Sequence, residues 1–145
     1  MSHVPYRAAS GIVVDMLSGQ VPASFQLIPN VWAQLTEGSI RPIAVASRER
    51  SLALPDVPTM AEQGLPDFES FAWFGLLVPK GTPKPIIDTL HSHVSRVMSD
   101  PAVRKRMVEI GADPAQSTPE EFRKLIAAEV TKWGEVIKDA KITVD

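Results

Sequence analysis

The chain has 145 residues, with 44% hydrophobic and 22% charged residues, which is ordinary usage for one globular domain. Its formal charge is −2, and its lysines and arginines alternate with acids, so no nucleic-acid partner is expected. The absence of cysteine excludes disulfides, thiol nucleophiles and thiolate metal sites.

The first half of the sequence alternates short apolar runs with segments of helical spacing. Strands are predicted at 3–6, 20–27 and 40–47, and helices at 10–17 and 31–37. Asn30 is expected to cap the second helix and Gly38 to end it. A repeated strand, helix, strand order implies a parallel sheet with crossover helices, so the predicted fold class is α/β.

A proline-rich connector follows at 54–66, LPDVPTMAEQGLP. Its three prolines fix the backbone φ near −65° and disfavour helix in the residues before them. Thr59 and Glu62 are expected to cap the one short turn between the prolines. A stiff connector of this kind sets the geometry between two structural units.

The second half is predicted to hold one strand followed by three helices. The apolar run 71–78 is the strand. The pairs Thr82-Pro83 and Asp100-Pro101 each place a cap and an N1 proline before a helix, and Gly111 stops the second one. The third helix begins with a capping box at 118–121, and residues 141–145 can form a last short strand.

No constellation for catalysis or metal binding is present in the sequence. His91 and His93 are two residues apart, so on a helix they point to different faces and cannot share a metal. The sequence lacks a nucleophile elbow, a zinc-protease motif, a Walker loop and a dinucleotide fingerprint. We therefore expect no enzyme, no metal and no cofactor.

The turn at residues 6–11 is the strongest candidate for a ligand site. A strand ends there, small residues let the backbone come close, and a helix begins, so free amide N–H groups meet the positive end of a helix dipole. Such a turn suits an anion, particularly a carboxylate, or it is a merely structural loop. Trp73, in the strand beside the connector, is either core or a ligand wall. The candidate ligand-binding residues of the turn are Tyr6, Arg7, Ala8, Ala9 and Ser10.

Several segments in the same order resemble one family, the Bug or TctC solute-binding receptors of tripartite tricarboxylate transporters. The segments are VPYR at 4–7, DMLSGQV at 15–21, RPIAVASRER at 41–50, the connector 54–66, WFGLLVP at 73–79 and GTP at 81–83. The later STPEE at 117–121 and WGEVIK at 133–138 fit as well. The resemblance covers nearly the whole chain.

The resemblance implies an incomplete piece of a type II-like periplasmic binding protein, because family members are much longer. Residues 1–70 would belong to lobe two, and residues 71–145 would cross back as a strand and the helical C-terminal part of lobe one. The turn at Tyr6 to Ser10 matches the family position that helps to hold a ligand carboxylate. Localisation would be periplasmic, although no signal peptide stands at this N-terminus.

The chain departs from the family pattern at two places. Arg7-Ala8-Ala9 stands where the family usually has Lys-Gly and small residues, and Gln26 stands where an aspartate is usual, so Gln26 would hydrogen-bond a ligand without the charge. The leading reading is the C-terminal portion of a receptor that delivers a small carboxylate to a membrane permease. The alternative is a truncated, self-associating paralogue with an interaction or sensing role. Exposed sheet edges favour a homo-oligomer in either reading.

Overall fold

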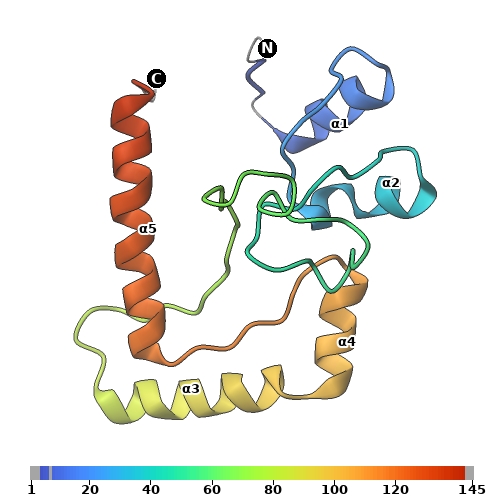
Figure 1. The fold of residues 1–145 in the computed structure, drawn as a ribbon. Helices are drawn as coiled ribbons and strands as arrows, with labels where there is room; N and C mark the ends of the chain where they lie inside the picture. The colour runs from blue at the N-terminus through green and yellow to red at the C-terminus, as the bar shows by residue number, and fades with distance from the viewer. Residues whose placement is uncertain (1–3, 7, 143–145) are drawn as a thin grey trace. The chain divides into compact units, whose positions relative to one another are not determined.

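The computed structural model describes residues 4–6 and 8–142 (Figure 1). In chain order its elements are α1 (Ala9–Leu17), the 3-10 helix η1 (Ile28–Val31), α2 (Trp32–Glu37), α3 (Lys84–Met98), α4 (Pro101–Glu109) and α5 (Pro119–Asp139). The chain forms two compact units. Unit 1 comprises Met1–Leu77 and Asp100–Pro114, and unit 2 comprises Val78–Ser99 and Ala115–Asp145.

The two short N-terminal helices of unit 1 form where helical spacing predicts them. In this unit η1 contacts both α1 and α2. Gly38 ends α2 with a φ of 75°, as expected for a glycine stop. The expected cap at Asn30 is wrong, because Asn30 lies inside η1 and Val31 takes the cap position without a side-chain hydrogen bond.

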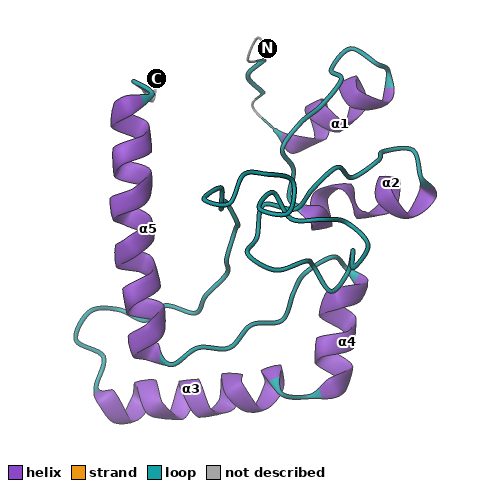
Figure 2. Cartoon of the chain, viewed as in Figure 1, coloured by secondary structure: helices purple, strands orange, loops and turns teal. Residues whose placement is uncertain are grey.

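The predicted β-strands are wrong over the described residues, where the only β pairing is a parallel bridge between Val45 and Thr59 (Figure 2). Val45 donates to Pro58 O and accepts from the amide of Met60, both at 2.9 Å. Residues 4–6, 20–27 and 71–78 form no ladder. A strand needs a neighbouring strand that bonds to it in a ladder, and no β-bridge joins these runs to another described segment. Residues 3 and 143–145 lie outside the described residues.

Unit 1 has a small core around this bridge. The buried apolar side chains among the described residues are those of Val31, Val45 and Val57, and Ser51 and Thr59 are buried with them. Asp113, which follows α4, reaches this core with its carboxylate. Its Oδ1 accepts from Ser51 Oγ at 3.2 Å and from the amide of Leu52 at 2.9 Å. One side chain therefore fixes the segment after α4 to the loop that leads into the connector.

The capped turn predicted in the connector is confirmed. The amide of Thr59 donates to Glu62 Oε2 at 2.7 Å, and the amide of Glu62 donates to Thr59 Oγ1 at 3.1 Å. Arg50 adds two further donors, with Nε 2.9 Å from Oε2 and Nη2 2.9 Å from Oε1. The hydrogen bonds from Arg50, followed by those from Thr59, lower the pKa of Glu62 to about 2. This carboxylate therefore stays ionised and holds the turn across the ordinary pH range.

The start signals of the later helices are confirmed in two of three cases. Asp100 caps α4 by accepting from the amide of Ala102 at 2.7 Å. Thr118 and Glu121 form the capping box of α5, and these hydrogen bonds lower the pKa of Glu121. The expected cap at Thr82 is wrong, because its hydroxyl donates to Pro79 O at 2.8 Å in the preceding turn. Pro83 occupies the cap position of α3 instead.

In unit 2 the segment leading into α5 is tied to α3. Gln116 Nε2 donates to Ser99 Oγ at 3.0 Å and to Ser95 O at 3.3 Å. His91 Nε2 lies 3.1 Å from Ser117 O. These polar contacts position the start of α5, while large apolar side chains on both helices remain exposed, including Val97, Val130 and Ile137.

Candidate functional site

The turn that enters α1 presents an open helix N-terminus. Ala8 takes the cap position in extended backbone, with φ −148° and ψ 145°, and no described side chain caps the helix. The first turn of α1 contains no acidic residue, and Ala8 and Ser10 are exposed. The amide end of α1 therefore has no carboxylate of its own among the described residues to compete with an anion. The candidate Arg7 lies outside the described residues.

Tyr6 fastens this turn to the body of α1. Its hydroxyl donates to Asp15 Oδ2 at 2.5 Å. Its ring lies against Gly11, where a Cβ atom would come within 3.3 Å of the ring's Cδ1. The hydrogen bond to Asp15, with smaller contributions from desolvation and from the aspartate charge, raises the pKa of Tyr6. The phenol proton is thus engaged inside the turn, and the hydroxyl oxygen remains as an acceptor.

The titration of Tyr6 tests this arrangement, because the chain contains a single tyrosine. We expect its absorbance titration to have a midpoint above the ordinary value of about 10. Because the pKa of Tyr6 is raised in the folded chain, its hydrogen bond to Asp15 stabilises the fold fully below the ordinary tyrosine pKa of about 10. This stabilisation is lost as the pH rises through the pKa of Tyr6 in the folded chain. Asp15→Asn should lower the midpoint, whereas Glu49→Gln should not. A wild-type midpoint equal to that of the urea-unfolded chain would contradict the contact.

The remaining candidate residues lie elsewhere in unit 1. Gln26 is half-buried in the loop before η1, and it directly follows Phe25. The Phe25 ring stacks on the Phe68 ring, with 6.1 Å between centroids. Trp73 is half-buried in residues 71–77, which form neither a helix nor a strand. The structure therefore brings Tyr6 and the start of α1 together, and it places Gln26 and Trp73 on two other segments of the same unit.

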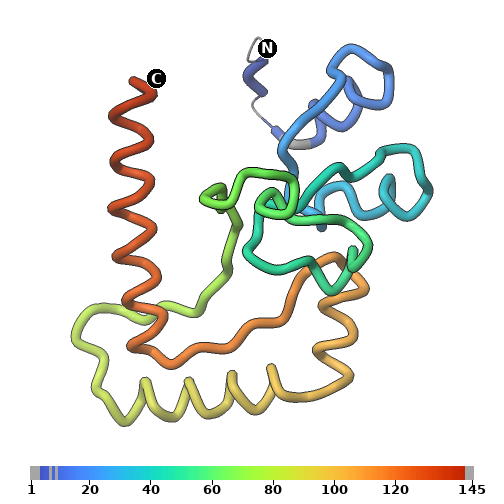
Figure 3. The backbone as a smooth tube through the Cα atoms, in the orientation of Figure 1, coloured from blue at the N-terminus to red at the C-terminus, as the bar shows by residue number. Residues whose placement is uncertain are grey.

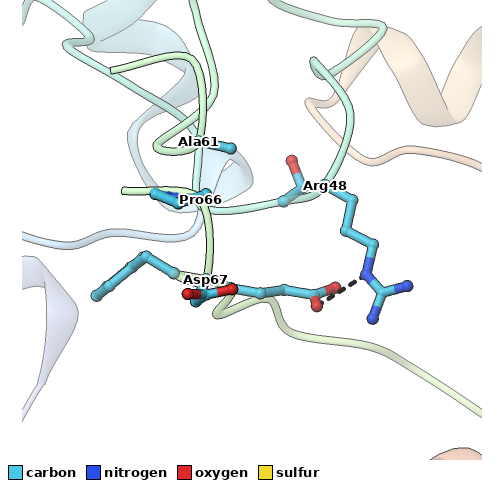
Figure 4. A pocket seen from close by; sticks show the side chains of 7 residues that line it. Arg48, Ala61, Pro66 and Asp67 are labelled. Atoms are coloured by element: carbon cyan, nitrogen blue, oxygen red, sulfur yellow. Dashed lines mark hydrogen bonds and ion pairs between the residues drawn. The ribbon is translucent and has the colours of Figure 1, made fainter. Parts of the chain in front are cut away.

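Unit 1 also carries a hollow of about 360 Å³ beside the connector (Figure 4). Its lining consists of Ser47, Arg48, Ala61, Pro66, Asp67, Phe68 and Glu69. Arg48 Nε donates to Glu69 Oε2 at 2.9 Å, so the one guanidinium in the lining is already paired. Two carboxylates against one paired guanidinium make this hollow unfavourable for an anion. It is therefore not the candidate carboxylate site.

Sequence reasoning missed the partner of Tyr6. Gly11 and Asp15 are four residues apart on α1 and so share one face of the helix. A tyrosine just before the helix can lay its ring on the glycine and reach the aspartate with its hydroxyl. The spacing of Tyr6, Gly11 and Asp15 was the available signal.

No described helix has the length and apolar character needed to cross a membrane. No group of three or more histidines, aspartates or glutamates in the described ranges is arranged to hold a metal ion.

Comparison with known proteins gives a family and several relatives. The family model described as "Tripartite tricarboxylate transporter family receptor" matches residues 1–142. Protein BugT of Bordetella pertussis is 37% identical over 136 residues, which are 94% of this chain and 42% of BugT. The chain thus spans less than half the length of that relative.

Solved structures agree with this match. Rpa4515 of R. palustris, solved with adipate, has a TM-score of 0.80 and 32% identity over 97% of this chain and 47% of its own. MatC (Rpa3494) of Rhodopseudomonas palustris, solved with bound malate, has a TM-score of 0.73 and 34% identity over 92% of this chain and 47% of its own. Other similar solved proteins are described as a periplasmic transporter and as the periplasmic binding protein BugD.

These matches bear on two predictions, the fold class and the family. The fold is that of part of a periplasmic binding protein, although the predicted parallel βα units are not formed in the described residues. The matched family is one of solute-binding receptors and not of enzymes. The resemblance read from the sequence motifs is confirmed: this chain belongs to the tripartite tricarboxylate transporter receptor family, TctC.

Proposed function

We propose that this chain is the C-terminal portion of an extracytoplasmic receptor that binds a small dicarboxylate and delivers it to the membrane permease of a tripartite transporter. The observation that carries the proposal is the family match over residues 1–142, together with similar proteins solved with adipate and with malate. Periplasmic localisation belongs to the same proposal, because similar proteins are periplasmic.

The proposed site is the open N-terminus of α1. Ala8, Ala9 and Ser10 would offer backbone amides to one ligand carboxylate, and the helix dipole would favour its charge. Tyr6 would hold the turn in shape through the hydrogen bond from its hydroxyl to Asp15. Arg7 would add charge, Gln26 a neutral hydrogen bond, and Trp73 an apolar wall. Because the chain spans under half of BugT and under half of Rpa4515, we expect its affinity alone to be weak.

Ala8→Asp is expected to weaken the binding of adipate while it stabilises α1. An aspartate at the cap position accepts hydrogen bonds from the first amides of the helix, which is worth about 1 kcal/mol to the helix. The same carboxylate occupies and repels the ligand position, so we expect affinity to fall about tenfold or more. Amide chemical shifts at residues 8–11, recorded during an adipate titration, measure both effects.

Ala8→Gly is the control, because it leaves the amides open and adds no charge. It should keep the adipate-dependent shifts at residues 8–11. Adipate binding by Ala8→Asp with wild-type affinity, or wild-type shifts confined to another part of unit 1, would overturn the proposed site.

A second candidate function is an interaction or sensing role for a truncated, self-associating paralogue. The observation that favours it is the number of large apolar side chains left exposed, among them Phe25, Phe74 and Leu77. Contiguous apolar surface on a soluble chain marks an interaction site. We propose that the isolated chain is a homo-oligomer for this reason. A monomer by sedimentation would exclude the oligomer.

A further inference from the structure

The hollow beside the connector lies in an acidic part of the chain. Residues 47–69, teal to green in Figure 3, fold as loops and turns and contain five acidic residues, two arginines and no lysine. Five carboxylates against two guanidinium groups exceed the formal charge of −2 of the whole chain. A concave surface with a negative field raises the local concentration of cations, so the hollow that disfavours an anion favours the opposite charge.

Both arginines of this segment are engaged by carboxylates of the same segment. Arg50 is held by Glu62 in the connector turn, with Nη2 2.9 Å from Oε1. Arg48 Nε donates to Glu69 Oε2 at 2.9 Å at the hollow itself. Asp67 lines the same hollow, and its carboxylate makes no hydrogen bond or ion pair with another described residue. The lining therefore keeps a negative charge that no described residue neutralises.

The walls of the hollow suit the apolar part of a small ligand. Ala61, Pro66 and Phe68 line it beside the charged side chains (Figure 4). The Phe68 ring is held by its stack on Phe25. An aromatic face attracts cations, and the planar guanidinium group stacks on it. The volume of about 360 Å³ lies at the lower end of the range for small-molecule sites, roughly 300–1,000 Å³, so the hollow fits a small molecule better than a peptide segment.

Arg48 is an example of the group that this lining accepts. Its guanidinium reaches Glu69 on an aliphatic stem, while its side chain stays 83% exposed. An ion pair this exposed contributes little to stability, so a free cation can take the place of the guanidinium. We propose that the hollow binds a small organic cation, a guanidinium or ammonium group on a short apolar stem. The charge lies beside Asp67 and Glu69, and the stem lies against Phe68.

The test is a titration with butylguanidinium at constant ionic strength, followed by amide chemical shifts. Butylurea has nearly the same shape without the charge and is the neutral control for the ligand. We expect butylguanidinium to shift the amides of residues 67–69 with an affinity on the order of millimolar, and butylurea to leave them unchanged. These shifts report the hollow directly, and the titration contains no carboxylate ligand. Failure of this site and failure of adipate binding are therefore separate outcomes.

Two acidic residues of the segment give a matched pair of variants. Asp67→Asn removes the carboxylate that has no partner, so the affinity for butylguanidinium should fall about threefold or more. Asp56→Asn is the control, because Asp56 is an exposed acid of the same segment that does not line the hollow. It should leave the affinity within a factor of about two.

Arg48→Ala should change the affinity in the opposite direction. It removes the guanidinium that competes for Glu69, so butylguanidinium should bind about twofold to fivefold more tightly than it binds the wild-type chain. A variant that only disturbed the loops around the hollow would weaken binding instead. The opposite signs expected for Arg48→Ala and Asp67→Asn therefore separate a charge-selective site from a structural effect.

Three results would overturn the proposal. One is the absence of butylguanidinium-dependent shifts at residues 67–69, or equal shifts with butylurea. Another is an affinity that Arg48→Ala leaves unchanged or lowers. The third is tighter binding of a short peptide with a single arginine, acetyl-alanyl-arginyl-alanine amide, than of butylguanidinium, which would assign the hollow to a protein partner.

Discussion

Gly111→Ala is expected to lower the free energy of unfolding of unit 1 by about 3 kcal/mol, as the sum of backbone strain and overpacking. Gly111 follows α4 with a φ of 79°, a conformation that side chains with a Cβ rarely adopt. A Cβ there would lie 2.6 Å from Ile28 Cγ2 and 3.2 Å from Trp32 Cε3. The added methyl would therefore push η1 and α2 away. Urea denaturation followed by circular dichroism measures the loss.

Gly38→Ala is the matched control for this prediction. Gly38 has nearly the same φ, 75°, and a Cβ there would meet no described atom within 4 Å. It should therefore show only the cost of the left-handed backbone, about 1 kcal/mol. Equal losses for the two variants would show that Gly111 is needed for its backbone conformation alone, and that the contact with Ile28 carries no weight.

The helices of this chain were predictable because their signals are local. Asp100 and the Thr118–Glu121 pair satisfy amides within three residues of themselves, and the Thr59–Glu62 pair does the same in the connector. Such contacts need no distant part of the chain. Where the local pattern allowed two solutions the prediction failed, as at Thr82, whose hydroxyl bonds backward to Pro79 O rather than forward into α3.

The strands could not be predicted in the same way, because a ladder depends on a second segment. Residues 40–47 and 71–77 have the apolar composition of buried strands, yet the one β-bridge that involves them is that between Val45 and Thr59. What the sequence does not contain is the hydrogen-bonding neighbour that turns extended backbone into a sheet.

In the candidate site, too, local features were predictable from the sequence and contacts between separate segments were not. The open start of α1 follows from small residues before a helix and is visible in the sequence. The use of Tyr6 as a brace for that turn depends on Gly11 and Asp15 together and emerges only in three dimensions. The choice of ligand depends on side chains from other segments, so Gln26 and Trp73 remain predictions.

Asp113→Ala is expected to lower the free energy of unfolding of unit 1 by about 2 kcal/mol, the cost of a buried donor left without its partner. Asp113 Oδ1 accepts from the hydroxyl of Ser51, which is 2% exposed, and from the amide of Leu52. Ser51 and Leu52 are more than 60 positions from Asp113 in the sequence, so no local sequence pattern predicts this contact. Removing the carboxylate frees the segment after α4 from the loop that leads into the connector. The loss is measured by urea denaturation.

Asp113→Asn separates the hydrogen bonds from the charge. The amide oxygen of asparagine can accept from both Ser51 and Leu52, so we expect this variant to lose less than half of what Asp113→Ala loses. Faster hydrogen exchange at the amides of Leu52 and Val45 in Asp113→Ala would show that the loss reaches the core bridge. If Asp113→Ala unfolds at the wild-type urea concentration, then Ser51 finds another acceptor and this contact does not hold unit 1 together.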